Sequence, residues 1–140
     1  MGAGIGQDEL DQLFSAALEA AVARLEKDGH FFPLMFELRS DGSVQAVAML
    51  ETGAVDGDVV ARKFAVLRQR ADEGLIRGAA VVCHESGSSQ IEVRIRAPRY
   101  ARDIAVPFTV ETRGFLRRRR ELLLGEFSDR PAANEVFPDA

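Results

Sequence analysis

Residues 91–97 read Ile91-Glu92-Val93-Arg94-Ile95-Arg96-Ala97, a strict alternation of apolar and charged side chains. Successive side chains of a β-strand point to opposite faces, so this pattern predicts a strand with one buried and one solvated face. Residues 103–110, Asp103-Ile104-Ala105-Val106-Pro107-Phe108-Thr109-Val110, alternate in the same way. The two stretches therefore predict an antiparallel pair that buries a common apolar face.

The connection between these strands predicts their register. If it closes around residues 98–101, apolar side chains face one another and one charged pair forms on the solvated face. The predicted partners are Ile95 with Ile104, Val93 with Val106, Ile91 with Phe108 and Arg96 with Asp103. Pro107 has no N–H to donate, which predicts an open side or a bulge in the second strand at that position.

A third strand is predicted just before this pair. The run Ala79-Ala80-Val81-Val82-Cys83-His84-Glu85 is more uniformly apolar, and Ser86-Gly87-Ser88-Ser89 connects it to Ile91. A strand whose consecutive residues are all apolar is typical of one covered on both faces. We therefore expect this strand to lie at the centre of the sheet.

The N-terminal half predicts a helix and a hairpin. Apolar residues recur at helical spacing from Asp8 to Asp28, and Gly29 follows as a stop signal. Phe31 to Arg39 and Val44 to Leu50 then predict two strands joined by Ser40-Asp41-Gly42-Ser43. The Asp-Gly pair is typical of a two-residue type I′ turn. That turn would set Phe36 opposite Val47 and Leu34 opposite Met49.

A second amphipathic helix is predicted from Val59 to Glu73, after Asp56-Gly57-Asp58 and before Gly74. Residues 115–124 fit neither the helical nor the strand period well. We favour an edge strand reached through Arg113-Gly114, because charged residues protect sheet edges from aggregation, and keep a helix as the alternative. Residues 1–7 and about 125–140 are expected to be irregular or flexible.

These elements predict one α+β domain over residues 1–140. Its order is α-β-β-α-β-β-β, with one further strand if residues 115–124 pair at the edge. We expect an antiparallel or mixed sheet with the helices packed on one face. The 140 residues, a net charge of −4, the single cysteine and the lack of a long apolar run predict a cytoplasmic protein without a disulfide or a membrane segment.

Four stretches of the C-terminal half carry a resemblance to a known group of proteins. They are residues 75–82 (Leu75-Ile76-Arg77-Gly78-Ala79-Ala80-Val81-Val82), residues 91–95, residues 105–108 (Ala105-Val106-Pro107-Phe108) and residues 135–138 (Glu135-Val136-Phe137-Pro138). Together they resemble small bacterial α+β proteins of unknown function, with no assigned activity. The resemblance implies the same order of elements and a bacterial cytosolic origin, and it implies no site residues.

Familiar catalytic and metal-binding patterns do not occur in this sequence. Cys83 and His84 are neighbours on a predicted strand, so their side chains point to opposite faces and cannot act on the same atom. We interpret Cys83 as a core thiol. His30, Cys83 and His84 lack the paired spacing of a zinc site. We therefore predict no catalytic residue, no cofactor and no metal.

The charge distribution is the unusual feature. Residues 91–120 contain nine arginines and three acids, a local net charge of +6, whereas the rest of the chain carries −10. Such asymmetry is typical of a contact surface for an acidic partner, and its plain alternative is a solvated face that pairs with nearby acids. The candidate binding surface consists of Arg94, Arg96, Arg117, Arg118, Arg119 and Arg120.

We interpret the chain as a non-catalytic binding or interaction module. Its arginine surface would meet an unidentified acidic protein or a second copy of the chain, and an exposed edge strand offers a route to a homodimer. The first alternative is an anion or nucleic-acid binder, which the overall charge of −4 and the shortage of stacking aromatics disfavour. The second alternative is an enzyme with a site near Cys83 and His84.

Overall fold

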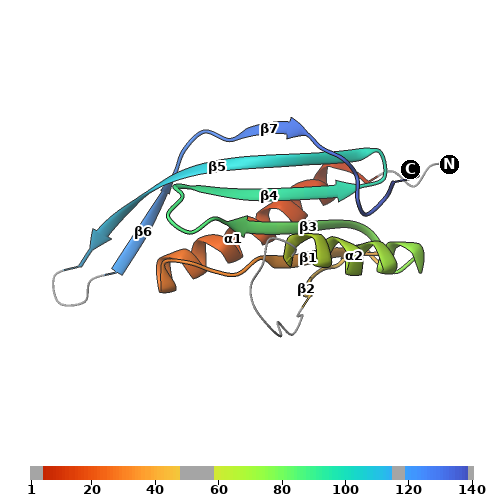
Figure 1. Ribbon diagram of the computed structural model, residues 1–140, viewed down its shortest axis with the longest axis horizontal. Coiled ribbons are helices and arrows are strands. Elements are labelled where there is room, and N and C mark those ends of the chain that lie inside the picture. Colours follow the sequence, from red (N-terminus) through yellow and green to blue (C-terminus); the bar gives the residue numbers. More distant parts are fainter. Residues whose placement is uncertain (1–4, 48–58, 115–118, 139–140) are drawn as a thin grey trace.

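Helices and strands follow one another in the order that the sequence predicts (Figure 1). The computed structural model describes residues 5–47, 59–114 and 119–138. The N-terminal elements are α1 (Gln7–Asp28), β1 (Leu34–Arg39), β2 (Val44–Val47) and α2 (Val59–Asp72). The C-terminal elements are β3 (Ile76–His84), β4 (Gln90–Ala97), β5 (Tyr100–Arg113), β6 (Arg119–Leu124) and β7 (Ser128–Pro131). The protein is therefore an α+β protein.

The strands form one sheet in the order β2-β1-β3-β4-β5-β6, and β7 pairs with β5 as well. Every pairing among the described residues is antiparallel. The chain reaches β3 through α2, so β1 and β3 become neighbours although they are far apart in sequence. The remaining pairs are hairpins or follow one another closely along the chain.

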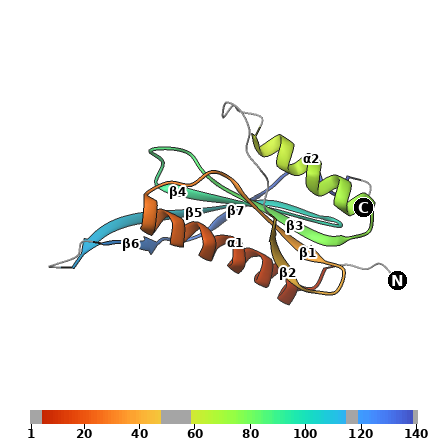
Figure 2. The same ribbon diagram turned by 90° about the horizontal axis from the view of Figure 1, so that it is seen from below.

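The two helices cover opposite faces of the sheet, as Figure 2 shows. Ala80 and Val82 of β3 pack with α1, whereas Ala79 and Val81 of the same strand pack with α2. The expectation that both helices pack on one face is therefore wrong. Its physical reason lies in β3 itself, because a strand that is apolar on both sides needs cover on both sides. The prediction that β3 is buried on both faces is confirmed.

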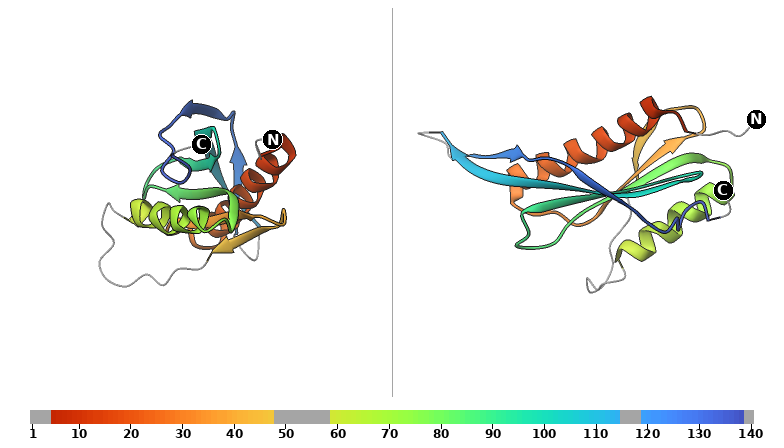
Figure 3. Two further views of the ribbon diagram at one scale, coloured as in Figure 1. Left: turned by 90° about the vertical axis from the view of Figure 1, so that its right-hand side faces the viewer. Right: turned by 90° about the horizontal axis from the view of Figure 1, so that it is seen from above.

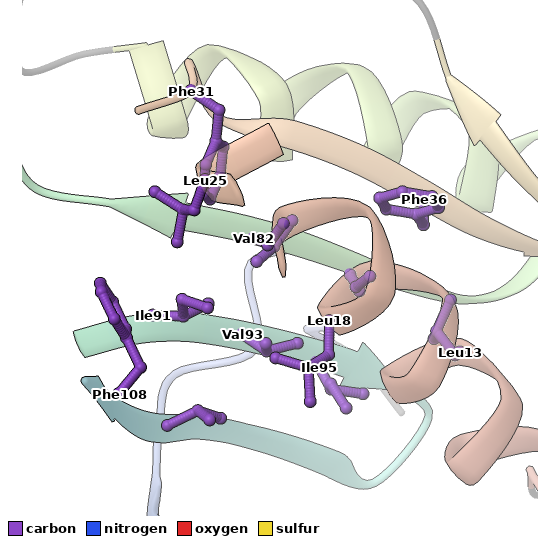
Figure 4. Close-up of a cluster of buried hydrophobic side chains, with 14 of the residues drawn as sticks. Leu13, Leu18, Leu25, Phe31, Phe36, Val82, Ile91, Val93, Ile95 and Phe108 are labelled. Carbon is purple, nitrogen blue, oxygen red and sulfur yellow. The ribbon is translucent and has the colours of Figure 1, made fainter. Parts of the chain in front are cut away.

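The larger of the two cores lies between α1 and the sheet (Figure 4). Leu13, Leu18 and Leu25 of α1 meet Val93 and neighbouring apolar residues of the sheet. Gly29 ends α1 with a φ of 78°, and its N–H donates to Leu25 O at 2.9 Å. This left-handed cap confirms the predicted helix stop.

The β4–β5 hairpin keeps the predicted faces but not the predicted register. Ala97 pairs with Tyr100, so the loop contains only Pro98 and Arg99 instead of four residues. Arg99 has a φ of 63°, and proline followed by a positive φ is the type II turn pattern. The observed partners are Ile91 with Val106, Val93 with Ile104, Ile95 with Arg102 and Arg94 with Asp103. A shift of two residues preserves the side-chain alternation, which is why the apolar face survives.

The β1–β2 register is one residue away from the prediction, because Phe36 pairs with Ala46. A type I′ turn needs a positive φ at both central residues. Here Gly42 has a φ of 91°, but the φ of Asp41 is not positive. Arg39 N donates to Ser43 O at 2.8 Å, which leaves a three-residue loop with its glycine in the left-handed region. Asp41 stabilises this loop by accepting a 2.9 Å hydrogen bond from Ser43 N. Met49 lies outside the described residues.

The C-terminal region is more ordered than the sequence predicts. Arg119–Leu124 forms the expected edge strand, and residues 115–118 lie outside the described residues. Ser128–Pro131 pairs with β5 although irregular chain was expected there. Val136 is also buried, in the core beneath α2. The helix alternative for 115–124 is therefore wrong over its described part.

A bulge separates β6 from β7 at the predicted position. Leu124 pairs with Phe108 and Ser128 pairs with Ala105, so β5 advances three residues while the opposite chain advances four. Gly125 N donates to Pro107 O at 2.7 Å, and a Cβ on Gly125 would stand 3.0 Å from Pro107 Cγ. The bulge accommodates the missing N–H of Pro107, but its extra residue lies in the chain opposite Pro107 and not in β5, where the sequence predicted it.

A buried ion pair joins α2 to β1. Glu37 is 1% exposed, and its carboxylate accepts hydrogen bonds from Arg70 Nε at 2.5 Å and Arg70 Nη2 at 2.8 Å. Arg39 Nε donates to the same carboxylate at 3.0 Å. Burial alone would raise the pKa of Glu37, but the hydrogen bonds from Arg70 and Arg39 outweigh it and hold the pKa below its ordinary value of 4.5.

We predict that Glu37→Gln lowers the free energy of unfolding by about 2 kcal/mol at neutral pH, because it leaves Arg70 without its counter-charge. A group whose pKa is depressed by folding stabilises the protein above its unfolded-state pKa and loses that effect as the pH falls. The difference between wild type and variant should therefore shrink below about pH 4.5. Urea unfolding at several pH values measures it, with the exposed Glu85→Gln as control. A difference that grows on acidification would contradict this account.

Candidate interaction surface

Arg96 does not lie on a contact surface, because its side chain is buried beneath α2. It is 1% exposed, and its guanidinium lies 5.0 Å from the ring centroid of Phe64. Nη1 lies 2.9 Å from Asp103 Oδ1 and Nε lies 2.6 Å from Glu135 Oε1. Arg96 thus joins β4, β5, α2 and the C-terminal segment. Arg96 and Asp103 do form an ion pair, but diagonally, because Asp103 lies opposite Arg94, and in the protein interior and not on the solvated face.

Arg94 lies on the same face and is also paired. Its Nε is 2.8 Å from Glu92 Oε1, and Arg130 Nη2 of β7 reaches the same oxygen at 3.3 Å. Arg130 also lies 3.7 Å from Asp103 Oδ2. Together with Arg96 and Glu135, this network contains three arginines and three acids. The face beside α2 is therefore electrically balanced, which does not favour binding of a polyanion.

We predict that Arg96→Ala lowers the free energy of unfolding by about 3 kcal/mol, because it leaves two carboxylates without their buried partner. Arg94→Ala, whose side chain is 31% exposed, should cost less than about 1 kcal/mol. Chemical denaturation of the two variants measures the contrast. Equal small effects would show that Arg96 is a surface residue after all.

Arg120 is bound to the end of α1. Its Nη1 donates to Lys27 O at 3.1 Å and to Glu26 O at 3.3 Å. These carbonyls are at the C-terminus of α1, where the helix dipole attracts a cation. Arg119 and Arg120 are both exposed, and Arg117 and Arg118 lie outside the described residues. The structure therefore does not bring the described predicted arginines together on one surface.

We predict that Arg120→Glu lowers the free energy of unfolding by about 1 to 2 kcal/mol, because it places a carboxylate beside the helix carbonyls. Arg119→Glu makes the same charge change on an exposed side chain, and should cost less than about 0.5 kcal/mol. Thermal or urea unfolding of both variants tests the difference. If both variants unfold alike, Arg120 is not the cap of α1.

Cys83 and His84 point to opposite faces of β3, as the sequence predicts. Burial raises the pKa of the Cys83 thiol to about 11, so the thiol is protonated at neutral pH. His84 lies between the rings of Phe31 and Phe108, with centroid distances of 6.0 Å and 5.8 Å. Its Nε2 is 2.7 Å from Ser88 O. This arrangement gives Cys83 and His84 no common reacting atom.

In the described ranges 5–47, 59–114 and 119–138, no group of three His, Cys, Asp or Glu side chains is placed to hold a metal ion. None of their helices is long and apolar enough to cross a membrane.

The clearest surface feature is a projecting arm formed by residues 108–113 of β5 and by β6. Figures 1 and 3 show β5 extending well past the end of β4, with β6 beside it. β4 begins at Gln90, opposite Pro107, so the last six residues of β5 pair with β6 only. We call this pair of segments the β5–β6 arm.

One edge of the β5–β6 arm has no strand beside it. Phe108 N donates to Ser89 O at 2.9 Å, which shows that the backbone groups of Phe108 face the β4 side. Backbone groups of alternate strand residues point to opposite edges, so those of Val110 and Thr112 face this side too. Within the described residues, no strand pairs with them there. We call residues 108–113 on this side the open edge of β5.

The opposite edge of the arm is covered by α1. The backbone N–H of Leu122 points away from β5 and donates to Glu26 Oε2 at 2.9 Å. Arg120 contacts the same end of the helix. The arm is therefore protected along β6 and unprotected along β5, while the outer strands β2 and β7 each have four described residues.

Exposed apolar side chains lie on both strands of the β5–β6 arm. Val110 is 50% exposed, and Leu123 and Leu124 are each 41% exposed. The sequence did not predict this site. Alternation in β5 continues to Val110, but nothing in the sequence shows that β4 begins only at Gln90. The signal that could have found it is the unequal length of the two strands, 14 residues in β5 against 8 in β4.

Comparison of the chain with protein-family models, with curated proteins and with solved structures finds no match.

Proposed function

We propose that this protein is a non-catalytic interaction module that self-associates through the open edge of β5. The observation that carries the proposal is a strand of the β5–β6 arm whose backbone donors and acceptors at Val110 and Thr112 pair with no described strand. Such an edge pairs readily with another strand, and proteins usually cover or shorten it. Here the neighbouring edge is covered by α1, whereas this one is not.

Glu111 and Arg113 pair with each other within the strand, and their charges also suit a second copy of the same strand. In an antiparallel two-fold pairing centred on Thr112, Thr112 faces the partner's Thr112, and their outward backbone groups exchange two hydrogen bonds. Glu111 then faces the partner's Arg113, and Arg113 faces the partner's Glu111. Both contacts join opposite charges. A pairing centred on Glu111 would instead place two carboxylates opposite each other.

The proposed self-association site is the open edge of β5 and not the arginine surface that the sequence predicts. Arg96 is buried and Arg120 is bound to α1, so the support for an anion or nucleic-acid binder is weaker than the sequence suggests. A site near Cys83 and His84 has little support as well, because the thiol is protonated and the two side chains diverge.

We predict a reversible dimer whose dissociation constant rises roughly tenfold in Glu111→Arg and in Arg113→Glu, since each change converts two attractive cross-strand contacts into repulsive ones. The double variant Glu111→Arg/Arg113→Glu restores both contacts and should dimerise like the wild type. Sedimentation equilibrium from about 10 µM to 1 mM covers the range expected of a small interface. Glu19→Arg, on the exposed side of α1, is the matched charge control.

A backbone change separates edge pairing from side-chain contact. Thr112→Pro removes an N–H that points away from β6, so the hydrogen bonds within the arm remain while one at the dimer axis is lost. We expect this variant to be a folded monomer. A wild-type protein that stays monomeric at the highest concentration rules out self-association, and a dimer that tolerates both Thr112→Pro and Glu111→Arg rules out this edge.

A further inference from the structure

A groove runs between the N-terminal half of α1 and the outer strands of the sheet. It encloses about 400 Å3, within the range of small-molecule sites. Its apolar lining comes from α1, from the sheet and from the bulge between β6 and β7. These residues are Leu10, Phe14, Ile95, Tyr100, Ile104 and Phe127.

Three of the lining side chains are aromatic. The rings of Phe14 and Phe127 lie 5.5 Å apart at an angle of 58°, and Phe127 is 47% exposed. Tyr100 lies at the start of β5 and is half-buried. No hydrogen bond engages its hydroxyl within the described part of the chain. The groove thus offers exposed ring surface and one unused polar group.

All the charge in the lining is negative. Asp11 and Asp129 line the groove, and no lysine or arginine does so among the described residues. Burial raises the pKa of Tyr100, and Asp129 and Asp11 raise it further while Arg102 opposes them. Both carboxylates therefore act on the same phenol. Arg102 approaches Asp129 Oδ2 only to 3.8 Å, a weak pairing at an exposed position.

We propose that this groove binds a small organic cation, an ammonium ion that carries an apolar or aromatic body. The ring faces attract a cation electrostatically, and the apolar wall accepts the body of the ligand. The two carboxylates supply the counter-charge and would repel an anion of the same shape. The site is independent of the open edge of β5, because it is built from α1, the start of β5 and the bulge.

The proposal is tested by NMR titration of the full chain with three small probes of similar shape: benzylammonium, benzyl alcohol and phenylacetate. Amide shifts of Gln7 and Ser128 report on the groove. We expect benzylammonium to bind about fivefold more tightly than benzyl alcohol, and phenylacetate to bind most weakly. Phe127→Ala should weaken benzylammonium binding by about fivefold, because the exposed ring is lost.

The decisive comparison is the double variant Asp11→Asn/Asp129→Asn, which keeps the shape of the groove and removes its charge. It should lose most of its preference for benzylammonium over benzyl alcohol, whereas Glu19→Gln, an exposed acid elsewhere on α1, should bind like the wild type. All these changes are on exposed or half-buried side chains, and the amide spectrum verifies that each variant is folded. Equal binding of the alcohol and the ammonium by the wild type, or an unchanged preference in the double variant, overturns the proposal.

Discussion

The need to bury β3 on both sides governs the architecture of this protein. The side chains of Ala79 and Val81 pack on the α2 side, and those of Ala80 and Val82 pack on the α1 side. All four residues are fully buried. A strand with two apolar faces is stable only between two layers. The chain supplies these layers with a helix before the first hairpin and a helix after it. β1 and β4 pair with the two edges of β3 and satisfy its backbone groups.

Much of this fold can be read from local patterns. Helix α1, its glycine stop, the alternating strands β4 and β5 and the bulge at Pro107 all follow from spacing or from the chemistry of one residue. The registers do not follow, because they depend on φ angles at Arg99 and Gly42 that several turn types could satisfy. Strand β7 was missed because its four exposed residues carry no apolar alternation.

The site was predictable only in part, for a different physical reason. The sequence does not show whether an arginine side chain will be solvated or paired with a carboxylate. Arg96 meets Asp103 and Glu135, and Arg120 meets the carbonyls that end α1, across separations of 39 residues or more for Glu135 and α1. These contacts exist only after the sheet and helices have assembled. A local excess of positive charge can therefore serve the interior of a protein as readily as its surface.

The bulge at Gly125 has a consequence for how the molecule can diverge. It divides the outermost chain segment into β6, which belongs to the β5–β6 arm, and β7, which belongs to the body of the sheet. Substitutions at exposed positions of the open edge, such as Val110, can thus accumulate with little effect on the core, whereas Phe108 and Leu122 of the arm belong to that core. Under the proposed self-association through the open edge of β5, related chains could acquire different binding specificities there on an unchanged scaffold.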